Sequence, residues 1–184
     1  MRFCPIALCA LSLGTTLTKS LGADPPNASK VKIQSTTGNT IQLNEVEVIV
    51  GGINVALGKT ATQGSTFRNK AKFDASNAID GDMETFSHTQ KKGCNWLEID
   101  LGSSLEIEGV VLHNRPCKDN DAAGCLCRLS HATVSLLNDA GQWVPGTWIG
   151  NTCEVLEWEY FFVPDTTANP SESPTLVRRR HGNL

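Results

Sequence analysis

Apolar and polar residues alternate over short stretches of this chain, and turn residues separate the stretches. The clearest stretch is 96–101 (Trp-Leu-Glu-Ile-Asp-Leu), which Gly102 ends. A period of two places successive side chains on opposite faces of an extended strand. The same pattern predicts strands at 31–34, 46–50, 107–113, 132–137, 143–149 and 156–163.

No stretch of ten or more residues has the periodicity of an amphipathic helix. Many short strands without long helices predict an all-β fold in which two antiparallel sheets pack face to face. We expect this β-sandwich to span residues 31–163 as a single domain.

The N-terminus has the layout of a secretory signal peptide. Arg2 supplies a positive charge, residues 3–13 are apolar, and the small residue Ala23 precedes Asp24. This layout predicts cleavage after Ala23 and a secreted, extracellular protein. The apolar stretch is shorter than the roughly 20 residues that cross a bilayer, so no transmembrane segment is expected.

The segments that flank the expected domain are polar. Residues 24–30 predict a short flexible segment, and residues 164–184 are rich in Pro, Ser, Thr and Asn. Such a composition buries too little apolar surface to offset its ordering entropy, which predicts a disordered C-terminal tail. We interpret the three arginines at 178–180 as a solvated charge run.

The charge balance argues against nucleic acid as a partner. The chain has 16 Lys and Arg against 19 Asp and Glu, a formal net charge of −3. Binding to phosphates needs clustered basic residues. An acidic balance is compatible with a bound cation such as calcium.

The chain has seven cysteines, of which Cys4 and Cys9 lie in the expected signal peptide. The remaining five favour two disulfides and one leftover thiol in an oxidising compartment. Cys94 is the candidate for the leftover thiol. The disulfide candidates are Cys117, Cys125, Cys127 and Cys153.

Cys125 and Cys127 point to the same face if they lie on an extended strand. They are then poorly placed to bond each other, and each is expected to pair with Cys117 or Cys153. A zinc site made by His113, Cys117, Cys125 and Cys127 is the alternative, although structural zinc sites usually use a Cys-x2-Cys spacing.

No catalytic motif is present: the chain lacks Gly-x-Ser-x-Gly, His-Glu-x-x-His and a phosphate-binding loop. Glu157 and Glu159 share one face of an expected strand, whereas glycosidase carboxylates face each other across the sugar. We interpret this pair as part of a solvated sheet face. The chain is therefore not expected to be an enzyme; a small hydrolase with an unrecognised site is the remaining alternative.

Three segments in order, 54–63 (Asn-Val-Ala-Leu-Gly-Lys-Thr-Ala-Thr-Gln), 75–81 (Ala-Ser-Asn-Ala-Ile-Asp-Gly) and 95–101, resemble the fucolectin family. These F-type lectins are part of the galactose-binding-like, discoidin superfamily, which includes the coagulation-factor type C domains. The resemblance covers about residues 31–163. It implies an eight-stranded jelly-roll sandwich with ligand-binding loops at one end.

The resemblance also implies a structural calcium ion. In fucolectins the ion is held by an Asn-x-x-Asp-x-Asn loop, a later hydroxyl and a Cys-Glu pair near the C-terminal strand. The matching residues are Asn77, Asp80, Asp82, Thr85, Cys153 (through its carbonyl) and Glu154. Calcium prefers such oxygen ligands. The alternative is an Asp-Gly turn that holds no metal.

Fucolectins bind fucose with one histidine and two basic residues, and the matching residues here are His88, Arg115 and Arg128. A neutral imidazole and forked guanidinium groups suit ring hydroxyls. Cys117 stands where the family has the aspartate that orients the first arginine. The arginines are thirteen positions apart instead of seven, because residues 118–124 enlarge the loop.

Asp119 or Asp121 could take over the orienting role of the missing aspartate. The alternative is that both arginines pair with the acids of this loop and that His88 only bonds the backbone. The predicted function is a secreted lectin-like module that binds a glycan or glycoconjugate and can form a homo-oligomer for avidity. An adhesion or matrix module of discoidin type, which binds protein or a membrane surface, is the alternative.

Overall fold

The structure, a computed structural model, describes residues 25–161 apart from 92, 94, 117–121, 150, 151 and 154. The predicted signal peptide and C-terminal tail lie outside the described residues.

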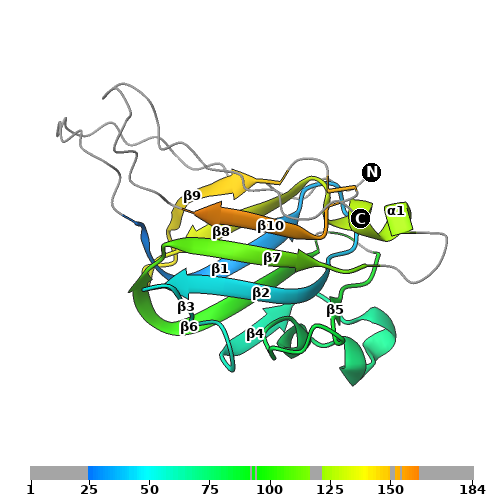
Figure 1. The fold of residues 1–184 in the computed structure, drawn as a ribbon, viewed down its shortest axis with the longest axis horizontal. Coiled ribbons are helices and arrows are strands. Elements are labelled where there is room, and N and C mark those ends of the chain that lie inside the picture. The colour runs from blue at the N-terminus through cyan, green and yellow to red at the C-terminus, as the bar shows by residue number, and fades with distance from the viewer. Residues whose placement is uncertain are drawn as a thin grey trace.

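The described residues form two stacked antiparallel sheets (Figure 1). In spatial order, the first sheet contains β4 (Thr60–Gln63), β6 (Trp96–Glu106), β1 (Asn27–Ser35), β8 (Ala132–Leu137) and β9 (Trp143–Trp148). The second contains β10 (Glu157–Phe161), β7 (Gly109–Asn114), β2 (Gln42–Val50) and β3 (Ile53–Asn54), and β5 (Ser87–His88) also pairs with β2. This architecture confirms the predicted all-β sandwich of two antiparallel sheets.

The described helices are short, as the sequence predicted. They are the 3-10 turns η1 (Phe67–Asn69), η2 (Ala71–Phe73), η3 (Ala75–Ala78) and η4 (Cys127–Leu129), and the five-residue α1 (Ala122–Leu126). Figure 1 shows α1 and β5 at the same end of the sandwich, where connections between strands from both sheets meet.

The core lies between the sheets and uses the alternating apolar residues. In the first sheet, Val31 of β1 is in register with Ile99 of β6 on one side and Leu136 of β8 on the other. Val46 of β2 faces the core from the second sheet, and all four side chains are buried. Burying each such side chain contributes about 1.5–3 kcal/mol, so the periodic strands supply much of the stability.

Strand β1 begins earlier than the sequence predicted. Residues 27–30, expected in a flexible segment, are part of β1, and Ala28 is fully buried in register with Leu105. The reason is that β6 continues to Glu106 and so offers hydrogen bonds to this polar segment. The flexible-segment prediction is therefore wrong from Asn27 onward.

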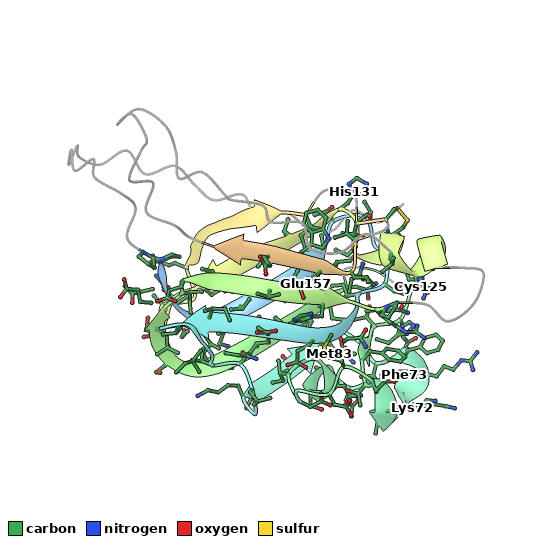
Figure 2. The ribbon with its side chains drawn as sticks, viewed as in Figure 1. Lys72, Phe73, Met83, Cys125, His131 and Glu157 are labelled. Carbon is green, nitrogen blue, oxygen red and sulfur yellow. A yellow bond between two sulfur atoms is a disulfide. The ribbon has the colours of Figure 1, made fainter. Side chains whose placement is uncertain are left out.

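The outer face of the second sheet carries a bridging histidine. His113 Nε2 lies 2.7 Å from Glu47 Oε1, and its Nδ1 lies 3.1 Å from Glu157 Oε2. These contacts join three strands, β2, β7 and β10. Figure 2 labels Glu157 on β10. Glu157 is thus half-buried and paired, where the sequence indicated a simply solvated acid.

We expect His113→Ala to lower the free energy of unfolding by about 1 kcal/mol, because both half-buried contacts to the glutamates are lost together. Urea denaturation measures the change. Glu159→Gln is the matched control, since Glu159 lies on the same face of β10 and forms no ion pair with the described residues. If the two substitutions change the free energy of unfolding equally, the contacts of His113 with Glu47 and Glu157 contribute nothing to stability.

Candidate functional site

The three residues predicted to bind sugar come from separate segments and meet at one end of the sandwich. His88 is in β5, Arg115 follows β7, and Arg128 is in η4. A pocket of about 330 Å³ is lined by His88, Arg128 and Phe67, together with Asn39, Thr40 and Lys91. Arg128 also lines a second pocket of about 490 Å³, which it shares with Arg115.

His88 is buried, with 8% of its surface exposed, and its ring stacks on Phe67 with centroids 4.3 Å apart. Its Nδ1 lies 2.6 Å from the Thr89 carbonyl oxygen. A carbonyl only accepts, so Nδ1 carries the proton and Nε2 of the neutral ring is an acceptor. Burial, followed by the charges of Arg128 and Arg115, lowers the pKa of His88, which keeps the ring neutral at pH 7.

Three phenylalanines surround this histidine. Besides Phe67, Phe73 and Phe86 lie 5.5 and 6.3 Å from the His88 ring, centroid to centroid. In Figure 2, Phe73 lies toward the end of the sandwich that carries α1 and Cys125. The site therefore combines aromatic walls with a few polar groups, which is typical of small-molecule sites.

Arg115 is held by two neutral partners. Its Nη1 donates to Gln42 Oε1 at 3.2 Å, and its Cζ lies 3.9 Å from the centre of the Phe86 ring. Gln42 is only 1% exposed and is the cross-strand partner of His88. Burial and the nearby Arg128 lower the pKa of Arg115, although a guanidinium stays charged at neutral pH.

Gln42 is thus a described partner of Arg115, whose orienting residue the sequence predicted to be Asp119 or Asp121. Those two residues and Cys117 lie outside the described residues, and neither arginine forms an ion pair with a described acid. In this region the sequence predicted a strand only at 46–50, whereas β2 begins at Gln42. Nor does the sequence show that β5 and Arg115 cover the polar side of this strand.

The cysteines fix the segment that carries Arg128. Cys127 is bonded to Cys153, which confirms two of the disulfide candidates and joins η4 to the segment before β10. Cys125 is also disulfide-bonded, and it lies in α1, so the conditional expectation of a strand here is wrong. The zinc alternative is wrong as well, because its Cys125 and Cys127 are bonded and its His113 lies between two glutamates.

The predicted calcium loop brings several oxygen atoms together. Thr85 Oγ1 lies 2.8 Å from Asp80 Oδ2, 3.1 Å from the Asp82 carbonyl oxygen and 3.3 Å from the Asn77 carbonyl oxygen. Gly81 has a φ of +77°, which allows the chain to turn sharply between the two aspartates. Four of the six predicted ligands therefore share one small region; Cys153 is in the disulfide, and Glu154 lies outside the described residues.

Strand β2 adds two residues that sequence reasoning missed. Asn44 Nδ2 donates to the Met83 and Thr85 carbonyls at 2.6 and 3.0 Å, and so holds the loop against the sheet. Glu45 is 4% exposed; its Oε2 accepts from the Gly81 amide at 3.2 Å, and its buried Oε1 has no hydrogen-bond partner.

The environment of Glu45 disfavours its charge. Burial, opposed in part by the Gly81 amide and reinforced by the charge of Asp80, raises the pKa of Glu45 to about 7. A buried carboxylate oxygen without a partner, next to a second carboxylate, is an arrangement that a bound cation would stabilise.

Among the described helices, none has the length and apolar composition that a membrane span requires.

A comparison with models of protein families matches residues 77–161 to the NedA-like, galactose-binding domain. The matched segment runs from the oxygen-rich loop to the last strand and includes His88, Arg115 and Arg128. Searches of curated proteins and of solved structures found no significant match.

The match covers less than half of the chain, and it does not distinguish fucolectins from other galactose-binding-like domains. Residues 77–161 are therefore similar to a galactose-binding-like domain, and the two-sheet architecture agrees with this similarity.

Proposed function

We propose that this protein is a secreted carbohydrate-binding module that holds a glycan at His88, Arg115 and Arg128. The observation that carries the proposal is the convergence of these three side chains, from three separate segments, beside an aromatic-lined pocket. The Cys127–Cys153 disulfide supports an oxidising, extracytoplasmic location.

The three polar groups have complementary roles toward a sugar. His88 Nε2 accepts a hydrogen bond from a ring hydroxyl, while the two guanidinium groups donate to hydroxyl oxygens. Phe67 and Phe86 provide apolar faces for the C–H groups of the ring. The resemblance to F-type lectins supports a fucose-like monosaccharide, whose hydroxyls suit this set of donors and acceptor.

A structural calcium ion is the second part of the proposal. The residues that fit it are the carbonyls of Asn77 and Asp82, the carboxylate of Asp80, the hydroxyl of Thr85 and the buried carboxylate of Glu45. Oxygen atoms of these kinds are what calcium binds. Cys153 and Glu154 stay predicted ligands, and bound calcium would fix the loop that precedes His88.

A glycan array with purified protein, in calcium and in EDTA, tests the proposal. We expect His88→Ala and Arg115→Ala each to weaken binding about tenfold or more, because each removes a hydrogen bond in a partly buried site. Lys59→Ala is the control, since Lys59 is exposed and lies outside both pockets. Wild-type protein that binds no glycan, or variants that bind as well as wild type, would refute the proposal.

The discoidin-type alternative is favoured by one observation. Ile53, Leu57 and Met83 are large apolar side chains that are 67%, 55% and 50% exposed. Exposed apolar loop residues are suited to a protein or membrane surface. Binding to vesicles or matrix proteins that survives His88→Ala and Arg115→Ala would support this second function. A homo-oligomer stays a prediction.

A further inference from the structure

We propose that the sugar site prefers a glycan residue that carries an anionic group, a carboxylate or a sulfate, over the neutral sugar with the same hydroxyls. This inference rests on the proposed function and specifies its ligand class.

The charges around the site are the first argument. The pocket beside His88 is lined by Arg128 and Lys91, and no described acid lines it. The neighbouring pocket adds Arg115 and only one described acid, the exposed Glu84. The chain as a whole has a net charge of −3. A positive site on an acidic protein attracts an anion specifically to this place.

The partners of Arg115 are the second argument. An aspartate at this place would orient the guanidinium and also neutralise it, but Cys117 stands at the matching position. Gln42 and Phe86 orient Arg115 instead, at 3.2 and 3.9 Å, and both are uncharged. None of the described acids forms an ion pair with Arg115, so within the described part of the chain its positive charge stays available to a ligand. Its partly buried surroundings make Coulomb attraction stronger than in water.

Geometry points to an oxyanion in particular. A guanidinium presents parallel N–H donors that match two oxygens of a carboxylate or sulfate. Arg128 lies between the two pockets and lines both. A sugar that occupies the His88 pocket can thus direct an acidic substituent toward Arg128, which also lines the pocket of Arg115.

Calorimetric titration with matched sugars tests the preference. The probes are galactose against galacturonic acid, for the carboxylate, and galactose against galactose 6-sulfate, for the sulfate. We expect at least one acidic member to bind about tenfold more tightly than galactose. This preference should shrink as NaCl rises from about 0.05 to 0.5 M, because salt screens the attraction.

Substitutions separate the charge effect from the fold. Arg128→Gln and Lys91→Gln should reduce the ratio of acidic to neutral affinity, while Lys59→Gln, the control, should leave it unchanged. Gln42→Glu should also reduce the ratio, since it gives Arg115 an internal carboxylate. Because Gln42 is buried, thermal melting must first show that this variant folds.

The outcomes distinguish this inference from the proposed function. If acidic and neutral members bind equally well, the anionic preference is wrong and carbohydrate binding stands. If the ratio is high but does not respond to Arg128→Gln and Lys91→Gln, the proposed origin of the preference is wrong. If neither galactose nor its acidic derivatives bind, the anionic preference is wrong; if the glycan array shows no binding either, both proposals fail.

Discussion

Replacing Cys127 and Cys153 together with serine is expected to lower the free energy of unfolding by about 3 kcal/mol. The disulfide closes a loop of 26 residues, and a loop of this size restricts the unfolded chain by about 3–4 kcal/mol in the chain-entropy treatment. The same substitution should weaken sugar binding, because Arg128 directly follows Cys127 in η4.

A second link between the same segments limits the loss of binding. Thr152 donates through its amide to Ser130 Oγ at 2.8 Å, and its hydroxyl bonds the Leu126 carbonyl. In the double serine variant, the free energy of unfolding should therefore fall more than the free energy of sugar binding does. Urea denaturation and sugar titration of the double variant measure the two effects.

Ser130→Ala in the disulfide-free background should then remove part of the remaining affinity. Serine substitution is preferable to a reducing agent, since Cys125 is bonded as well. An unchanged urea midpoint in the double variant would contradict the stabilising role of this disulfide.

The strands could be predicted from the sequence wherever an alternating segment is buried on one face along its length. Residues 96–101 are such a case, since Leu97, Ile99 and Leu101 are fully buried in β6. Strands β3 and β5 have two residues each, too few to show any period. They form because neighbouring strands offer unpaired hydrogen-bonding groups, which is a property of the assembled sheet.

The residues of the candidate site also divide into those that the sequence could identify and those that it could not. His88, Arg115 and Arg128 could be identified because the resemblance rests on motifs that are local in sequence. Gln42 and Glu45 could not, since each became important only when a distant segment folded over β2. Alternation predicts which side chains share a face; it does not predict which polar face a loop will cover.

Glu45→Gln is expected to abolish most of the stabilisation that calcium gives the protein. In the metal-free protein, burial raises the pKa of Glu45 from 4.5 to about 7. The folded state therefore holds this proton more tightly than the unfolded state. The resulting stability is fully present below pH 4.5 and is lost as the pH rises through 7, by up to about 3 kcal/mol.

Calcium should oppose this loss of stability at high pH, because it binds the charged carboxylate of Glu45 and so favours the ionised form. The increase in melting temperature that calcium gives over EDTA should thus be small at pH 5 and largest at pH 8. Glu45→Gln should flatten the pH dependence in EDTA and lose the calcium response, because a neutral amide has no charge to bury.

Melting curves at pH 5, 6, 7 and 8, in calcium and in EDTA, measure both effects. Glu84→Gln is the matched control: this exposed acid follows the loop aspartates and should keep the full calcium response. A calcium response that persists in Glu45→Gln would exclude Glu45 as a ligand. If EDTA does not lower the melting temperature of the wild type at pH 8, the loop binds no structural calcium, and the unpartnered Oε1 is a cost that the fold tolerates without a cation.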